Sequence, residues 1–375
     1  MPLYLNRDLG VRDASQVALW TGLALGGTGL AMALVGPIWG AVGDRFGLKS
    51  MVVRALFGGG LAVLLMGLVT TPVQLVGTRV LFGALAGAVT AANALVVAET
   101  PTVNVTRALG VMGSGLPLGR SFGPLVGSAL VAFFTFRQVF IATGVVLAAA
   151  TLLVMTGVRE TPRQRTGERH GFAELRRADG RTLRAIAAII LAQGLVQWAS
   201  SSAQGLLAVR ALILAPASAT WVAGIAFAAS GLATALGSYL YWRPAGWLGL
   251  GRFAIVGSLV LFVAVALLAL APSVTAVVVA NAAVGLVNGA VAPALAAMLG
   301  LEAPARTKGT VFGWSASASA VGIGAGPLLT GVIAAAAGVP VGLLVAGVTG
   351  LLAALALLLW GREPSLVARA EAGPA

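Results

Sequence analysis

The chain is divided by charged residues and prolines into apolar runs, each about as long as a membrane is thick. An α-helix rises 1.5 Å per residue, so about 20 apolar residues cross the hydrocarbon core of a bilayer. Of the 375 residues, 59% are hydrophobic and 9% are charged. Soluble domains carry about 25% charged residues, because polar groups must cover their surface. The sequence therefore predicts an all-α polytopic membrane protein and excludes a soluble enzyme.

We expect eleven transmembrane helices. They are predicted over residues 17–42, 51–70, 74–98, 107–132, 138–158, 184–209, 220–242, 252–271, 274–299, 310–336 and 338–360. Two hydrophilic stretches separate or follow them. These predict an N-terminal helix bundle at 1–158, a linker at 159–183, a C-terminal bundle at 184–360 and a solvated tail at 361–375.

The chain also repeats itself. At an offset of 203 residues, six glycine, proline and glutamate positions recur: Glu99, Pro101, Gly110, Gly119, Gly123 and Pro124 fall on Glu302, Pro304, Gly313, Gly322, Gly326 and Pro327. At an offset of 202, Arg79, Gly83 and Gly87 fall on Asn281, Gly285 and Gly289. The repeat predicts two homologous halves. The helix at 184–209 then has a first-half partner ending near residue 6, so we expect one further helix upstream or lost.

The charge distribution predicts topology. The formal net charge is +13, and the basic residues gather in the linker and in alternate short loops, with no aromatic interleaving. This pattern is typical of the positive-inside rule and argues against a nucleic-acid partner. We expect a multi-pass protein of the cell membrane with linker and C-terminus cytoplasmic. The chain has no cysteine and one histidine, so we expect no metal site and no cofactor.

The loop after the first visible helix carries the clearest motif. It reads Gly40-Ala-Val-Gly-Asp44-Arg45-Phe-Gly47-Leu48-Lys49. This resembles the signature loop of the major facilitator superfamily, except at Leu48, where the family usually has arginine. By the same resemblance, Glu99 and Arg107 could join this loop in an inner gate. The alternative is a solvated, positively charged loop.

A second motif follows in the span 107–132. Its small residues are Gly110, Gly119, Gly123, Pro124 and Gly127. The spacing resembles the fifth-helix motif of the exporting, antiporter branch of the superfamily, with Ser128 in place of the last glycine. Such glycines let another helix pack close, and the alternative is a generic packing face of small residues.

The resemblance covers the whole visible chain and implies two six-helix bundles that rock about a central site. It implies a monomeric, proton-coupled exporter of small amphipathic molecules. The alternatives are an importer or facilitator of a small metabolite, or a non-transporting protein of the same fold. Catalysis is not expected, because the chain has no Ser/His/Asp set: its only histidine, His170, lies in the linker.

Polar and charged residues within spans are candidates for the transport site, because lipid cannot satisfy them. One face of the helix 184–209 carries Gln193, Gln197, Ser200, Ser201 and Gln204, with Trp198 beside it. The other candidate substrate ligands are Asn93, Asn281, Asn288 and Trp314. Two arginines lie within spans: Arg79 faces a cavity or snorkels to the surface, and Arg120 faces a cavity or binds an acid. The alternative for the amides is hydrogen bonding between helices.

Overall fold

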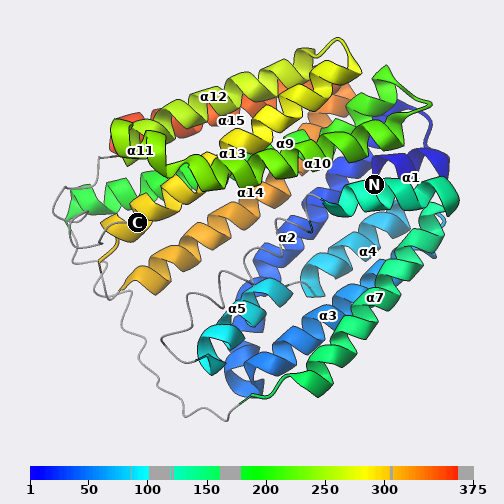
Figure 1. The fold of residues 1–375 in the computed structure, drawn as a ribbon, viewed down its shortest axis with the longest axis horizontal. Helices are drawn as coiled ribbons and strands as arrows, with labels where there is room; N and C mark the ends of the chain where they lie inside the picture. The colour runs from blue at the N-terminus through cyan, green and yellow to red at the C-terminus, as the bar shows by residue number, and fades with distance from the viewer. Residues whose placement is uncertain (86, 101–118, 120–121, 161–178, 305–306, 362–375) are drawn as a thin grey trace.

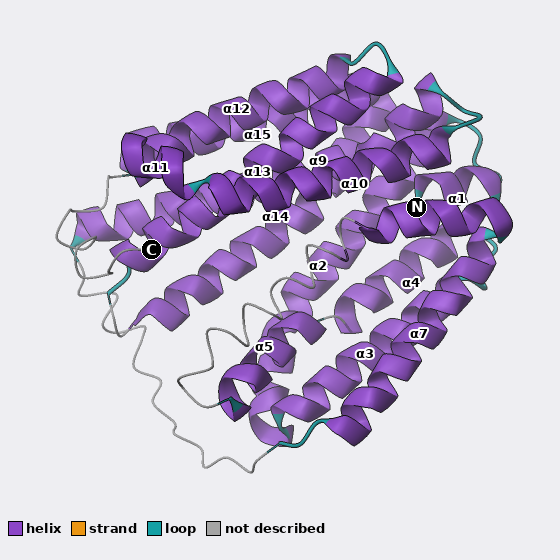
Figure 2. Cartoon of the chain, in the orientation of Figure 1, coloured by secondary structure: helices purple, strands orange, loops and turns teal. Residues whose placement is uncertain are grey.

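The computed structural model describes residues 1–85, 87–100, 119, 122–160, 179–304 and 307–361. Within these ranges every regular element is a helix (Figures 1 and 2). The helices are α1 (Pro2–Arg7), α2 (Ala14–Phe46), α3 (Leu48–Met66), α4 (Pro72–Leu85), α5 (Ala88–Glu99), α7 (Phe136–Gly157), α9 (Gly180–Leu214), α10 (Ala219–Leu240), α11 (Trp242–Leu248), α12 (Leu250–Leu270), α13 (Val274–Glu302), α14 (Lys308–Ala337) and α15 (Val339–Trp360).

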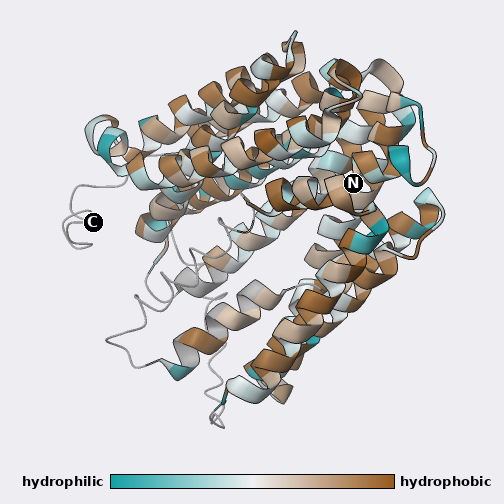
Figure 3. Cartoon of the chain, turned by 45° about the vertical axis from the view of Figure 1, so that its right-hand side comes forward, coloured by the Kyte–Doolittle hydropathy of each residue, from teal (hydrophilic) through white to brown (hydrophobic). Residues whose placement is uncertain are grey.

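The all-α membrane architecture is confirmed. Among the described residues, nine helices are long and apolar enough to cross a membrane, and two shorter apolar helices, Pro72–Leu85 and Phe122–Phe133, accompany them. Together they stand at the places of the eleven expected spans. Many large hydrophobic residues of these helices are exposed, and hydrophilic residues gather near helix ends (Figure 3). This distribution is what lipid contact requires.

One expected span is not a single helix. The prediction of an unbroken helix over 74–98 is wrong, since α4 ends at Leu85 and α5 begins at Ala88. Gly87 between them has φ +115°, a left-handed conformation that only glycine adopts without strain. The indole Nε1 of Trp39 donates a hydrogen bond of 2.7 Å to the carbonyl oxygen of Ala84. This bond satisfies one of the carbonyls that the break leaves without a helical partner.

The two halves repeat the same packing. On α2, a Cβ added to Gly22 would lie 2.5 Å from the carbonyl oxygen of Pro327 on α14. At the matching place on α10, a Cβ on Gly224 would lie 2.8 Å from Cβ of Ser128 and 3.4 Å from the carbonyl oxygen of Pro124. Gly22 and Gly224 are 202 residues apart, and Pro124 and Pro327 are 203 apart. The duplication seen in sequence is therefore a duplication in space.

The halves meet along only part of their length (Figure 1). The close contacts of α2 with α14 lie at Gly22, Gly26 and Gly29, in the first half of α2. Further along α2, Leu34 is 75% and Ile38 is 58% exposed. We call the end at which α7 finishes and α9 starts the linker end, and the opposite one the far end. The halves are packed at the far end and part toward the linker end.

Candidate functional site

A central cavity lies where the halves face each other. Its volume is about 440 Å³. The first half contributes Gly119 and Pro124, and the second half contributes Gln197, Ser200, Ser201, Gln204, Phe227, Ser230, Gly231, Thr234, Asn288 and Ile323. The polar residues come from α9, α10 and α13, which pack as neighbours in the second half. Pockets for small molecules have this size and this mixture of apolar walls with a few polar groups.

The structure brings three predicted ligands into this cavity. Gln197 and Ser201 lie on the polar face of α9, and Asn288 approaches from α13. Ser200 and Gln204, from the same polar face, also line it. Phe227 supplies the aromatic wall. Four residues of the polar stripe of the helix 184–209 therefore share one cavity.

Two other predicted amides serve a different purpose. Gln193, one turn before Gln197, accepts a hydrogen bond from the hydroxyl of Ser315 on α14. Asn281 is fully buried, and its Nδ2 donates a bond of 2.9 Å to the carbonyl oxygen of Ala226 on α10. Both lie outside the described cavity lining, and their role as substrate ligands stays a prediction. They join helices, because an amide inside a span takes whichever partner is nearest.

The remaining predicted ligands lie apart from the cavity. The backbone of Trp198 packs against Gly322 and Gly326 of α14. Trp314 lines a separate apolar pocket of about 340 Å³ between α9 and α14, together with residues such as Ile190. The side chain of Asn93 lies outside the described residues. Neither tryptophan belongs to the described lining of the central cavity, and their role as substrate ligands stays a prediction.

The glycine motif of the first half is described at three of its four glycines. Gly110 lies outside the described residues, and a Cβ on Gly119, Gly123 or Gly127 would meet nothing within 4 Å. Among the described atoms these three glycines therefore make no close helix contact, and the packing role of the motif stays a prediction. At the repeat of this motif, Gly326 does pack on α9, with Trp198 O and Ser201 Oγ each 3.0 Å from an added Cβ. By the repeat, the six-residue helix α1 of the first half corresponds to the C-terminal end of α9 in the second half.

The motif instead contacts the other half through the residues around Pro124. Gly119 and Pro124 line the cavity, and Ser128 packs against Gly224. The hydroxyl of Ser128 donates to the carbonyl oxygens of Pro124, at 2.8 Å, and Thr220 on α10, at 3.0 Å. Ser128 thus adds a hydrogen bond between halves at the position where the family motif has glycine.

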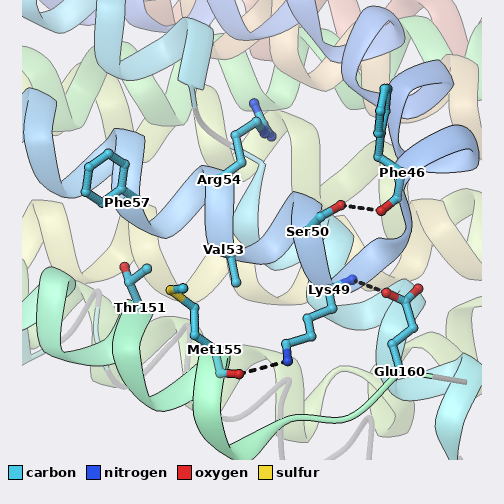
Figure 4. A pocket seen from close by; sticks show the side chains of 9 residues that line it. All are labelled: Phe46, Lys49, Ser50, Val53, Arg54, Phe57, Thr151, Met155 and Glu160. Atoms are coloured by element: carbon cyan, nitrogen blue, oxygen red, sulfur yellow. Dashed lines mark hydrogen bonds between the residues drawn. The ribbon is translucent and has the colours of Figure 1, made fainter.

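The signature loop is held by a residue that sequence reasoning missed. Glu160 accepts a hydrogen bond of 2.7 Å from the backbone N–H group of Leu48 and one of 3.0 Å from that of Lys49. Figure 4 shows the bond to Lys49. These are the first free N–H groups of α3, where a carboxylate is favoured by the helix dipole. Lys49 Nζ donates a bond of 2.8 Å to the carbonyl oxygen of Met155 on α7. The start of the linker is therefore attached to this loop.

Gly47 is required by this arrangement for two reasons. Its φ is +91°, and a Cβ there would lie 2.7 Å from the carboxylate of Glu160. The second half repeats the turn, since Gly249, 202 residues later, has φ +86° and precedes α12. Gly40, Asp44 and Arg45 belong to the backbone of α2, and their side chains lie outside the described residues. Glu99 ends α5, and Arg107 lies outside the described residues.

Two arginines lie inside the first half. The Arg54 guanidinium carbon stands 3.6 Å from the ring centroid of Trp39, a cation–π contact beside the break between α4 and α5. Arg79 accepts, through its carbonyl oxygen, a bond of 3.1 Å from the hydroxyl of Thr28. Its Nε is buried and has no hydrogen-bond partner within the part of the chain that is described. Arg120 lies outside that part.

At the far end, the carboxyl group of Asp8, just after α1, has a raised pKa. Burial raises it, while the positive charges of Arg137 and Arg7 oppose that rise. The neighbouring Tyr4 donates to the carbonyl oxygen of Met66 at 3.1 Å, which attaches α1 to α3. These contacts close the first half at the end away from the linker.

Comparison with known proteins agrees with this geometry. The family model described as Major Facilitator Superfamily matches residues 1–202 and 185–374, once for each half. The chain belongs to the major facilitator superfamily. It is therefore a membrane transporter, as the signature loop and the repeat predicted.

Two relatives illustrate the match in sequence. The "Uncharacterized MFS-type transporter YuxJ" of Bacillus subtilis is 32% identical over 324 residues, covering 84% of this chain and 82% of the relative. "Multidrug resistance protein MdtG" of Salmonella arizonae is 27% identical over 345 residues, covering 90% and 84%.

In structure, the transporter resembles a bacterial homolog of the human lysosomal transporter Spinster in an inward-facing and occupied conformation. The TM-score is 0.76 at 17% identity, covering 94% of this chain and 90% of that one. A mutant form of the nucleoside transporter NupG has a TM-score of 0.74 at 13% identity, covering 92% and 91%. At such identities, both matches show the fold alone.

Proposed function

We propose that this transporter exports small amphipathic molecules from the cell by alternating access, driven by protons that flow inward. The observation that carries the proposal is the central cavity. It combines the apolar side chains of Phe227 and Ile323 with the amides of Gln197, Gln204 and Asn288. A molecule with one apolar and one polar part fits such a wall. The multidrug-resistance name of the MdtG relatives supports export.

The mechanism uses the two ends of the interface in turn. With the linker end on the cytoplasmic side, as the basic residues predict, the present arrangement opens the cavity inward and closes it outward. Closure depends on glycine contacts such as Gly22 with Pro327 and Gly224 with Ser128. Rocking of the halves would break these contacts and form new ones around the linker-end half of α2. The cargo would then leave on the other side.

Proton coupling is proposed from the resemblance of the helix around Pro124 to the antiporter motif. Coupling requires that the proton gradient change the populations of the inward-open and outward-open states. The proposal is compatible with the absence of any Asp or Glu from the described lining of the cavity, because the titrating group need not contact cargo. Protonation elsewhere could shift the same equilibrium between states.

Vesicle transport tests the proposal. Inverted vesicles containing the transporter should accumulate a fluorescent amphipath when the interior is acidified, and a protonophore should abolish the accumulation. Ile323→Trp would fill the cavity and should remove transport. Val332→Trp is the matched control, since Val332 is 45% exposed on the same helix and does not line the cavity. Accumulation in right-side-out vesicles instead would identify an importer, and no gradient-dependent flux would contradict transport of such compounds.

A further inference from the structure

The second half contains five amide side chains within its helical spans whose surroundings fall into two classes. Gln193 and Asn281 make hydrogen bonds to neighbouring helices. Gln197, Gln204 and Asn288 line the central cavity and make no hydrogen bond within the described structure. The first class is explained by packing. The second class faces the open space of the cavity, since Gln204 is exposed and Gln197 and Asn288 are half-buried, and these amides are available to a bound molecule.

The three unbonded amides share one cavity wall. Gln197 and Gln204 lie seven residues apart on one face of α9, about 10 Å along the helix. Asn288 reaches the same cavity from α13, and its Oδ1 is buried without a partner in the described part of the chain. A primary amide offers two donors and a carbonyl acceptor, all without formal charge. The wall can therefore bind several hydrogen-bonding groups along its length.

The described lining of this cavity contains no ionisable side chain. A cation or anion that entered would lose hydration without gaining an opposite charge from these residues. An uncharged group that donates and accepts hydrogen bonds would lose little, because the amides replace its water. Phe227 and Ile323 offer apolar contact to the rest of the molecule.

We infer that Gln197, Gln204 and Asn288 select cargo whose polar end is an uncharged hydrogen-bond donor, such as a carboxamide, sulfonamide or hydroxyl group. This inference rests on the proposed function, because it assumes that cargo occupies the central cavity. It assigns to three residues the recognition of the polar end, and it separates them from Gln193 and Asn281, which hold helices together.

A matched pair of probes tests the inference. Dansylamide is neutral, fluorescent and carries an N–H donor, whereas N,N-dimethyldansylamide has no such donor. Flux is measured in proteoliposomes with an imposed pH gradient, and leakage into protein-free liposomes is subtracted. Loss of one hydrogen bond should lower kcat/KM for the methylated probe by about two- to tenfold. Ethidium, a permanent cation, serves as the charged comparison and should be transported less well than dansylamide.

Two pairs of variants identify the residues. Asn288→Leu and Gln197→Leu should bring the ratio between the two dansyl probes close to one. Asn281→Leu and Gln193→Leu change the same residue types on the same helices, and should lower the unfolding temperature while leaving that ratio unchanged. Lower thermal stability in the second pair alone would support the division into two classes.

The results separate this inference from the proposed function. Equal transport of the two dansyl probes by the unmodified protein would overturn the inference and leave transport intact. So would preferred transport of ethidium, or a ratio that Asn288→Leu and Gln197→Leu do not change. If none of the three probes moves with the gradient, the proposed export of amphipathic molecules fails, and the inference fails with it.

Discussion

A single methyl group at Gly22 should disturb the balance between the two states of the transporter. Gly22 lies on α2 where the halves are in contact at the far end. A Cβ there would lie 2.5 Å from the carbonyl oxygen of Pro327 and 2.8 Å from Cα of Gly331. Both are backbone atoms of α14, which cannot rotate away as a side chain can. Gly22→Ala therefore requires the two helices to move apart.

The size of the effect follows from the contact. Overpacking in a close-packed interface costs about 1–3 kcal/mol. Applied to the closed far end alone, this cost changes the ratio of the two states by about five- to 150-fold. Alanine also favours helix over glycine by about 1 kcal/mol. That gain cancels in the comparison, since α2 is helical in either state.

Spin labels can measure the change in population. The chain has no cysteine, so introduced cysteines are unique attachment sites. Leu68 and Ala217 are exposed and lie at the far end, one in each half. With both labelled, Gly22→Ala should increase the fraction of long distances between the labels in double electron–electron resonance.

Gly77→Ala is the matched control. Gly77 is exposed on α4 of the same half, and a Cβ there would meet nothing within 4 Å. This variant should leave the distance distribution unchanged. If Gly22→Ala and Gly77→Ala gave the same distribution as the unmodified protein, the contact of α2 with α14 would not determine closure, and the reasoning would be refuted.

Three further changes test other contacts. Ser128→Ala removes a hydrogen bond between halves and should shift the same label distances by about two- to fivefold in population, whereas Ser258→Ala, whose hydroxyl bonds only within α12, should not. Glu160→Ala removes the carboxylate at the start of α3 and should lower the free energy of unfolding by about 1–3 kcal/mol, measured by thermal unfolding. Asp179→Ala is its control and should leave that free energy unchanged, because the Asp179 side chain makes no capping hydrogen bond at the start of α9. Trp39→Phe keeps a ring beside the guanidinium but loses the bond to the end of α4, so amide hydrogen exchange should accelerate in α5; unchanged exchange would mean that this bond does not stabilise the break.

The spans and the duplication could be predicted because their signals are local or periodic. Hydropathy depends on the residue itself and on the solvent around it, and lipid rewards apolar side chains wherever they lie. Glycine and proline positions recur at offsets of 202 and 203 because both halves bend and pack in the same way. The break at Gly87 could not be predicted from the repeat, because a glycine at the equivalent position does not by itself end a helix. Its second-half counterpart, Gly289, lies within the unbroken helix α13.

The sequence by itself determined that this chain is a membrane transporter of two related halves with a polar face on α9. Only the tertiary structure decided which amides of that face form hydrogen bonds with a neighbouring helix. Gln193 and Gln197 are one turn apart and chemically identical, but Ser315, 122 residues away in the chain, binds the first and not the second. Glu160 likewise meets the signature loop across more than 110 residues. Such partners are set by how helices are placed against one another, and the order of residues along one helix does not contain that information.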